Sequence, residues 1–349
     1  MTKTYFRPLA LVFGIDARNL IAGGLAGALG GMPSIGFMAV EEMVRDGKLV
    51  SKRIRSFADV ASHELISNIT TVRPPIAGLV LDQPHIMGIV NVTPDSFSDG
   101  GRYDATDAAV AHGLALAEQG AAILDIGGES TRPGSSEVSL DEEGSRILPV
   151  IGTLAKGHIV SVDTRKSVLM RKAAEVGAKI INDVSALGFD PLSASTVAAS
   201  GLPVVLMHAQ GEPRTMQLAP KYDDVLLDVY DQLEVLVAKA VAAGIPKVRI
   251  CIDPGIGFGK SFRHNLDLLQ GLTIFHGLGV TLLVGLSRKG IVGAVTGEKM
   301  AANRVAGSVG GALQAAVMGA HILRVHDVNE TVDALAMFRA GLEPDLSGV

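Results

Sequence analysis

The chain has 349 residues, of which 48% are hydrophobic, 41 are glycine, 4% are aromatic and none is tryptophan. This balance suits packed aliphatic strands joined by tight turns, so we expect an α/β protein with a sizeable core. The formal net charge of −5 excludes an overall field that would hold nucleic acid or an anionic membrane. The single cysteine, Cys251, excludes an intrachain disulfide and a cysteine-based zinc site, and it favours a reducing compartment. We expect Cys251 to be a small apolar strand residue.

Residues 1–84 form an extension with no repeat and no chemical cluster. Within it, segments 37–45 and 57–65 resemble helices, and the basic stretch 48–55 indicates a solvated face. The apolar stretch 9–40 is interrupted by charges and a proline, so it lacks the roughly 18 apolar residues of a membrane helix and the order of a signal peptide. We therefore expect a cytoplasmic protein with no membrane segment. A packed cap, an interface element and a mobile arm all stay open for the extension.

From residue 85 onward, short β-branched runs alternate with amphipathic stretches. The predicted strands are 86–92, 122–127, 158–163, 179–183, 203–208, 248–253, 281–285 and 321–325. The predicted helices are 106–119, 140–155, 166–176, 223–243, 301–318 and 329–340. Nearly continuous apolar strands are typical of a parallel sheet covered by helices, and eight such units match the usual size of a closed barrel. The sequence therefore predicts a (β/α)8 TIM barrel over 85–343, preceded by the N-terminal extension, with an open doubly wound sheet as the alternative.

Polar residues stand at or just past the carboxyl end of these strands. They are Asn91, Asp163, Asn182, Asp183, His208, Asp253 and Arg324. In a closed barrel these ends share one rim, where the loops that follow the strands build active sites. Charged and amide groups beyond apolar strands need partners, and a ligand rich in N–H donors, such as a bicyclic aminopyrimidine, would satisfy them. The alternative is that each residue only holds its own loop together.

Two loops and the last two strands indicate phosphate chemistry. Loop 91–101 is dense in hydroxyls and carboxylates, although a turn that only satisfies its own backbone is an equal alternative. Arg132 lies among glycines and hydroxyls in loop 127–134, with a structural pairing to Glu129 as the alternative. Arg324 and His326, two apart at the last strand, would point the same way in extended geometry and would grip a pyrophosphate together with Arg132.

Seven motifs occur in order along the barrel region. They are NVTPDSFSDGG (91–101), GGESTRPG (127–134), VDT (162–164), INDV (181–184), DPGIGFGK (253–260), GLSRKG (285–290) and RVHDV (324–328). Together they resemble the pterin-binding family and, within it, the dihydropteroate synthases, from about residue 84 to residue 341. The segment MHAQG (207–211) departs from the family's Met-His-Met pattern at Ala209, which changes one apolar wall and not the reaction.

The resemblance implies a transferase of folate biosynthesis that joins 6-hydroxymethyl-7,8-dihydropterin pyrophosphate to 4-aminobenzoate and releases pyrophosphate. It implies that the pterin is bound by Asp163, Asn182, Met207, Asp253, Phe258 and Lys289. It implies that the pyrophosphate is held by Arg132, Arg324 and His326. It implies that the 4-aminobenzoate site is shaped by Phe97, Thr131, Pro133 and Ser287. Asn91 would be a ligand of Mg²⁺, and Asp99 would lie over the reacting groups; both would act in catalysis beside Arg132, Lys289, Arg324 and His326.

The resemblance also implies a dissociative substitution and a homodimer, for which an apolar face on 301–318 would serve as an interface. Pyrophosphate would leave first, giving a cation delocalised into the pterin, and the amine would then attack. Two other functions are weighed against this one. A methyltetrahydrofolate-dependent corrinoid methyltransferase shares the barrel and the pterin pocket but needs no pyrophosphate clamp. A silent pterin-binding module would need no intact set of reactive residues.

Overall fold

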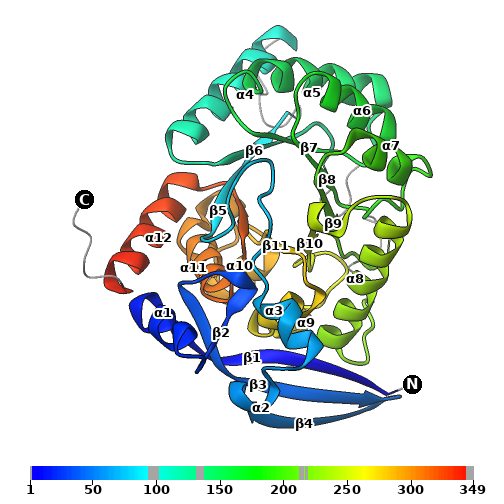
Figure 1. Ribbon diagram of the computed structural model, residues 1–349. Coiled ribbons are helices and arrows are strands. Elements are labelled where there is room, and N and C mark those ends of the chain that lie inside the picture. Colours follow the sequence, from blue (N-terminus) through cyan, green and yellow to red (C-terminus); the bar gives the residue numbers. More distant parts are fainter. Residues whose placement is uncertain (1, 93–101, 131–136, 212–215, 217–218, 343–349) are drawn as a thin grey trace.

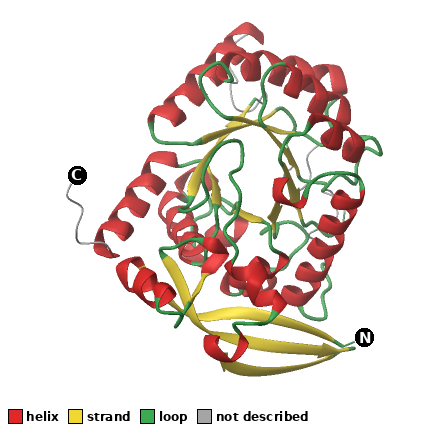
Figure 2. Ribbon diagram, viewed as in Figure 1, coloured by secondary structure: helices red, strands yellow, loops and turns green. Residues whose placement is uncertain are grey.

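The computed structural model describes residues 2–92, 102–130, 137–211, 216 and 219–342. Within these ranges the chain forms a closed parallel barrel ringed by helices, with an antiparallel sheet from the N-terminal residues against its side (Figure 1; Figure 2). No helix in these ranges is long and apolar enough to cross a membrane.

The barrel consists of eight parallel strands. They are β5 (His85–Asn91), β6 (Ile123–Gly127), β7 (Val160–Asp163), β8 (Ile180–Asp183), β9 (Val204–Met207), β10 (Ile250–Asp253), β11 (Thr281–Val284) and β12 (Ile322–Val325). β12 pairs with β5, for example Arg324 with Met87, so the sheet closes on itself. The predicted TIM barrel is therefore confirmed, and the open sheet is excluded.

Helices follow the strands around the outside of the barrel. They are α4 (Arg102–Glu118), α5 (Leu140–Leu154), α6 (Ser167–Glu175), α7 (Ser193–Ser200), α8 (Val225–Ala242), α9 (Phe262–Gln270), α10 (Gly290–Thr296), α11 (Val305–Val317) and α12 (Val328–Leu342). Short 3-10 turns join them: η3 (Lys247–Arg249), η4 (Leu272–Leu278) and η5 (Ala301–Asn303). The sequence did not predict α7, α9 or α10.

Strand alternation decides which side chains enter the barrel. On β6, Leu124 and Ile126 pack in the core between strands and helices, whereas Ile123 packs in a second core inside the barrel. Cys251 of β10 lies in that inner core, 1% exposed, so the expectation of a small buried strand residue is confirmed. Ile76 and Leu81 close the inner core at the amino end of the strands. The opposite end, where the strands finish, is left to polar residues.

The N-terminal residues form their own sheet with helices at its flank. Its elements are β1 (Lys3–Phe13), α1 (Gly14–Ala22), β2 (Gly27–Ala28), η1 (Leu29–Gly31), β3 (Ile35–Asp46), β4 (Leu49–Ser56), α2 (Phe57–Val60) and α3 (Glu64–Thr70). β3 is central and pairs with β1, β2 and β4. The sheet lies beside the barrel, where β1 packs against η4 and charged side chains of β1 and β3 contact α8 (Figure 1). Phe6, Phe37 and Val40 pack in a core of its own.

The helix predicted at 37–45 is wrong, because this segment is the middle of β3. Phe37, Val40 and Met43 are spaced three apart and so imitate one face of a helix, but pairing with β1 and β4 along both edges overrides that local pattern. The prediction at 57–65 holds for Phe57–Val60 and again from Glu64, with a turn between. The basic stretch 48–55 is mostly exposed on β4, as expected.

Candidate active site

The carboxyl ends of the barrel strands gather polar residues at one rim. Each of these residues lies on the side of its strand that faces the barrel interior. Nearer the amino end, the same side of the strands carries the apolar residues of the inner core. The predicted site residues placed this way are Asn91 of β5, Asp163 of β7, Asn182 of β8, Met207 of β9, Asp253 of β10 and Arg324 of β12. The structure therefore brings together six of the side chains that the sequence singled out.

Arg324 is held between two carboxylates inside the barrel. Its Nε lies 2.6 Å from Asp125 Oδ2, and a terminal guanidinium nitrogen lies 2.7 Å from Asp163 Oδ2. Asn182 Nδ2 also donates to Asp125 Oδ2, at 3.0 Å. Asp125 is fully buried, and its other oxygen has no partner among the described residues. Sequence reasoning missed Asp125, although a carboxylate inside the apolar run 122–127 was a usable signal.

Burial next to like charges shifts the ionisation of this cluster. Desolvation, opposed by Arg324 and assisted by Asp125, raises the pKa of Asp163 to about 7. Desolvation, opposed by Lys289, likewise raises the pKa of Asp253. Burial acts to lower the pKa of Arg324, but Asp125 and Asp163 outweigh it and raise that pKa. The Arg324 cation thus lies beside carboxylates whose pKa values are raised because burial has removed their water. N–H donors of a ligand would replace part of that lost hydration.

Asp253 begins a glycine-rich loop, residues 253–260, that holds Lys289. Gly255 N–H donates to Asp253 Oδ1 at 2.7 Å. Lys289 Nζ donates to the Ile256 carbonyl at 2.6 Å and lies 4.5 Å from the centre of the Phe258 ring. Burial lowers the pKa of Lys289 to about 8, with Asp253 opposing. Asp253 and Phe258 of one motif and Lys289 of another, predicted together as pterin residues, form one wall.

Ser287 and His326 meet at the ends of the last two strands. His326 N–H donates to Ser287 Oγ at 3.2 Å, and His326 Nδ1 lies 3.1 Å from the same oxygen. Ser287 is buried and His326 is half-buried. Arg288, between Ser287 and Lys289, instead forms an ion pair with Asp327. The structure therefore joins one residue predicted for 4-aminobenzoate with one predicted for pyrophosphate.

Two rim residues hold loops. Asp183 accepts hydrogen bonds from Ser185 N–H, Ser185 Oγ and Leu187 N–H. His208 is 1% exposed and lies between Gln232 and Lys260. For Asp183 and His208, the alternative of holding the local structure is the one that the contacts favour.

Five predicted residues lie outside the part of the chain that the structure describes. They are Phe97, Asp99, Thr131, Arg132 and Pro133. Glu129, which the sequence offered as a partner of Arg132, forms ion pairs with Arg165 and Lys166, at 2.7 and 2.8 Å.

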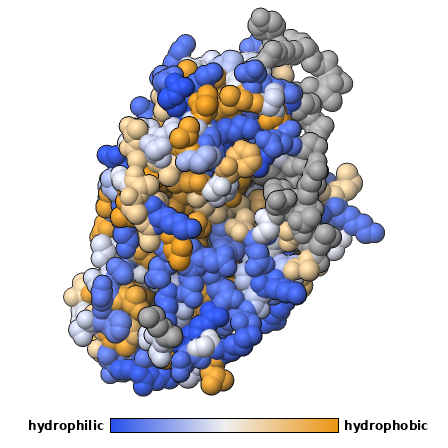
Figure 3. Space-filling model, turned by 90° about the vertical axis from the view of Figure 1, so that its right-hand side faces the viewer, coloured by the Kyte–Doolittle hydropathy of each residue, from blue (hydrophilic) through white to orange (hydrophobic). Residues whose placement is uncertain are grey.

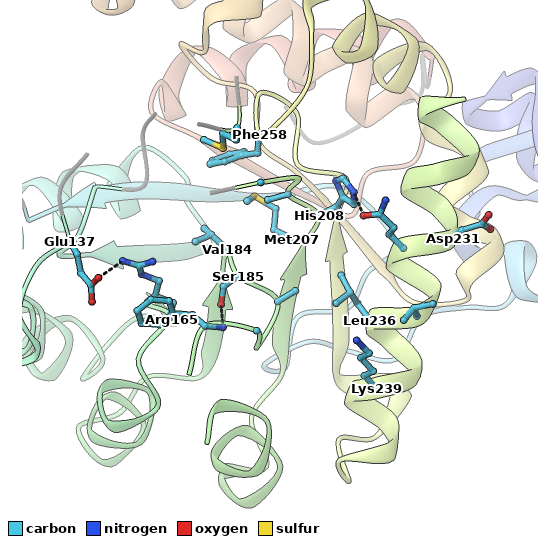
Figure 4. A pocket seen from close by; sticks show the side chains of 18 residues that line it. Glu137, Arg165, Val184, Ser185, Met207, His208, Asp231, Leu236, Lys239 and Phe258 are labelled. Carbon is cyan, nitrogen blue, oxygen red and sulfur yellow. Dashed lines mark hydrogen bonds and ion pairs between the residues drawn. The ribbon is translucent and has the colours of Figure 1, made fainter. Parts of the chain in front are cut away.

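A cavity of about 1030 Å³ opens beside this rim, between the loop after β8 and helix α8 (Figure 4). Met207, Ala209 and Phe258 border it on the barrel side, and Gln232 and Leu236 on the helix side. This side of the molecule mixes hydrophobic and hydrophilic surface (Figure 3). Ala209, where the sequence departs from the family pattern, therefore faces open space.

A closed parallel barrel whose polar side chains converge at the carboxyl ends of its strands is the architecture of a TIM-barrel enzyme. Comparison with known proteins narrows this class. A family model described as pterin binding enzyme matches residues 87–326. The dihydropteroate synthase of Escherichia coli (strain K12) is 48% identical over 266 residues, which cover 76% of this chain and 94% of that protein. The folate synthesis bifunctional protein of Arabidopsis thaliana is 42% identical over 272 residues, 72% of this chain and 49% of that protein.

Solved structures agree. The dihydropteroate synthase of Xanthomonas albilineans with 4-aminobenzoic acid is 51% identical, has a TM-score of 0.73, and is matched over 78% of this chain and 98% of that one. The same enzyme in complex with 7,8-dihydropteroate is 50% identical with a TM-score of 0.69, over 75% and 95% of the two chains. The chain belongs to the pterin-binding enzyme family, among its dihydropteroate synthases.

Proposed function

We propose that this chain condenses 6-hydroxymethyl-7,8-dihydropterin pyrophosphate with 4-aminobenzoate, giving 7,8-dihydropteroate and pyrophosphate in folate biosynthesis. It is thus a transferase. The observation that carries the proposal is the convergence of Asp163, Asn182, Asp253 and Lys289 in a barrel that matches dihydropteroate synthases along nearly their whole length. Carboxylate and amide oxygens complement the N–H groups of an aminopyrimidinone ring, and the lysine complements its carbonyl oxygen.

The same residues would bind and orient the pterin. Asp253 and Asn182 accept hydrogen bonds from the ring, and Met207 and Phe258 pack against its faces. Lys289 exchanges the Ile256 carbonyl for the ring, a short movement because its side chain already lies over Phe258.

In the reaction, the bond between the exocyclic methylene carbon and the pyrophosphate oxygen breaks, and its electron pair leaves on that oxygen. The nitrogen of 4-aminobenzoate supplies the pair for the new C–N bond and loses one proton to solvent or to pyrophosphate. Asp163 and Asp253 stabilise the positive charge that develops on the pterin, while Arg324 and His326 stabilise the departing anion. An unprotonated aromatic amine needs no strong base, so the residues need only hold the partners in place.

We also propose that Asn91 contributes an oxygen ligand to Mg²⁺ at the rim. Among the described residues no cluster of three or more His, Cys, Asp or Glu side chains could hold a metal ion. A single carboxamide oxygen fits Mg²⁺ all the same, because this ion commonly takes one or two protein oxygens and completes its shell with substrate phosphate and water. When bound, it would neutralise charge on the pyrophosphate.

The proposed assembly is a cytoplasmic homodimer. Val295 of α10 and Met300 before α11 are 61% and 64% exposed, and the first turn of α11 adds the small exposed residue Ala306. A face of this kind is suited to close packing of a second copy. Light scattering of the purified protein gives the mass that tests this point.

The decisive experiment follows pyrophosphate release and dihydropteroate formation with the purified full chain. The assay contains the dihydropterin pyrophosphate, 4-aminobenzoate and Mg²⁺, and each is omitted in turn. Product formation that requires all three supports the proposal. Binding of the pterin pyrophosphate without product favours a silent module, and no binding at all would overturn both the pocket and the function.

A further inference from the structure

The N-terminal sheet contacts helix α8 through a cluster of charged side chains. Arg45 of β3 lies 2.6 Å from Asp228, and Lys3 of β1 lies 2.6 Å from Asp231. Tyr5 OH donates to Asp231 at 2.9 Å. The pair of Arg45 and Asp228 is largely buried, with side chains 17% and 18% exposed, so it is less screened than a surface pair.

The same turn of α8 also contacts the residue that follows β9. Gln232 follows Asp231 and lies one helical turn after Asp228, and its Oε1 lies 2.8 Å from His208 Nε2. His208 Nδ1 lies 2.8 Å from Lys260 Nζ. Because a lysine only donates, His208 Nδ1 accepts and its Nε2 carries the hydrogen that Gln232 receives. Desolvation, and then the charge of Lys260, lower the pKa of His208 to about 3, so the ring stays neutral.

Lys260 anchors the loop that carries the pterin residues. It is 2% exposed, and its Nζ also donates to the Phe258 carbonyl at 2.9 Å. The loop packs closely against the residue that follows β9, since a Cβ on Gly255 would lie 1.9 Å from the His208 carbonyl oxygen. Through its Ile256 carbonyl and the Phe258 ring, the loop in turn holds Lys289.

We propose that the N-terminal sheet is a positioning element for the pterin pocket, acting through α8, Gln232, His208 and Lys260 on loop 253–260. None of these relay residues needs to touch the reacting atoms, so they are positioning residues. The inference rests on the proposed function, and it assigns a role to residues that lie before the 87–326 match to the family. A helix is stiff along its axis, so a shift where the sheet holds it displaces Gln232, one turn away, together with its partner His208.

The test uses full-length Arg45→Ala and the milder Tyr5→Phe, which loses the contacts of the hydroxyl with Asp231 and Arg45. The matched control is Arg53→Ala, which removes another sheet arginine that pairs with Glu42 and not with α8. We expect Arg45→Ala to weaken binding of the dihydropterin pyrophosphate about five- to tenfold and Tyr5→Phe less, with kcat and the KM for 4-aminobenzoate changed less than about twofold. Arg45→Lys should restore most of the affinity.

Hydrogen exchange provides a readout that does not require turnover. Amides of residues 255–260 should exchange faster in Arg45→Ala and in Gln232→Ala than in the wild type or in Arg53→Ala. The effects of Arg45→Ala and Gln232→Ala should combine to less than their sum, because both act on one relay. Unchanged exchange in the loop, or equal changes in Arg53→Ala, would overturn the inference. A wild type that forms no dihydropteroate would instead defeat the proposed function and leave the exchange test intact.

Discussion

Asp125 Oδ2 lies 2.6 Å from Arg324 Nε, and this contact joins β6 to β12, the two strands that flank β5 in the barrel. Asp125 and Asp163 therefore share one guanidinium, each bonded to a different nitrogen of Arg324. Arg324 is aimed by Asp125 into the barrel mouth, next to the residues proposed to hold the pterin.

Asp125→Asn should keep the side-chain shape and remove its charge. Asp125 helps to raise the pKa of Asp163, so its neutralisation should lower that pKa from about 7. If ionised Asp163 binds the pterin, activity rises with pH as Asp163 loses its proton, and this rising limb of kcat/KM should move to lower pH in the variant. We also expect pterin affinity to fall roughly tenfold, because Arg324 loses a charged partner.

The pH profile of kcat/KM for the pterin substrate checks this prediction. Asp82→Asn, at an exposed position on the amino side of β5, is the control and should leave the profile in place. A rising limb that stays fixed or moves upward in Asp125→Asn would show that Asp125 does not control Asp163.

Asp125 is a site residue whose role could not be predicted from the local sequence. The eight barrel strands were predictable because each is buried on both faces and reads as an apolar run, and the rim residues were predictable because they interrupt those runs at one end. Asp125 also interrupts a run, but its partner Arg324 lies 199 positions away, and only closure of the barrel brings them together.

Local pattern failed in two other places for related reasons. α7 and α10 have only 8 and 7 residues, too few to display a clear helical period. Length does not explain why α9 was missed, since α6 also has 9 residues and was predicted. β3 owes its strand form to β1 and β4, whose pairing no local window contains. The sequence does not decide between a ligand-binding and a structural role for His208, because its partners Gln232 and Lys260 are distant in the chain.

His321 should make the protein sensitive to acid. Its Nε2 lies 3.0 Å from the Gly30 carbonyl and its Nδ1 accepts from Leu282 N–H, so the neutral ring joins the N-terminal unit to the barrel. Burial lowers the pKa of His321 to about 4, below its ordinary value near 6.5. A depressed pKa gives stability that is fully present above pH 6.5 and is lost as the pH falls toward 4. The slope for one group is at most about 1.4 kcal/mol per pH unit.

Urea unfolding at several pH values, for wild type and His321→Asn, measures this effect. The variant should be less stable at pH 7.5, and the difference between the two free energies of unfolding should shrink as the pH falls below 6.5. His112→Asn replaces an exposed histidine on α4 and should show a constant, small difference. A gap for His321→Asn that does not narrow would count against a neutral buried ring.

Glu143 should contribute far more stability than a surface carboxylate of similar pairing. It is fully buried, it accepts from Thr164 Oγ1 at 2.6 Å, and it forms an ion pair with Lys166. Glu143→Ala leaves Lys166 with one carboxylate fewer in a buried setting, and we expect a loss of about 3 kcal/mol.

The matched control for Glu143 is Glu175→Ala, which breaks an exposed pair with Arg171 on α6. That change should cost less than about 0.5 kcal/mol. Chemical denaturation of both variants gives the comparison, and similar losses in the two would mean that burial does not govern these ion pairs.

Gly255 and Gly310 should respond in opposite directions to the same substitution. At Gly255, φ is +66° and an added Cβ would lie 1.9 Å from the His208 carbonyl oxygen, a backbone atom that cannot rotate away. Gly255→Ala should therefore lower the free energy of unfolding by more than about 2 kcal/mol and displace the N–H that Asp253 accepts, with loss of pterin binding.

Gly310 is exposed in the middle of α11, and an added Cβ there meets nothing within 4 Å. Gly310→Ala should raise the free energy of unfolding by about 0.5–1 kcal/mol, because alanine loses less backbone entropy on folding, and it should leave pterin binding unchanged. Denaturation and calorimetric titration with the pterin substrate measure both quantities. If Gly255→Ala bound the pterin as the wild type does, loop 253–260 would tolerate a shift at Gly255. The close contact of Gly255 with the His208 carbonyl would then not be needed for pterin binding.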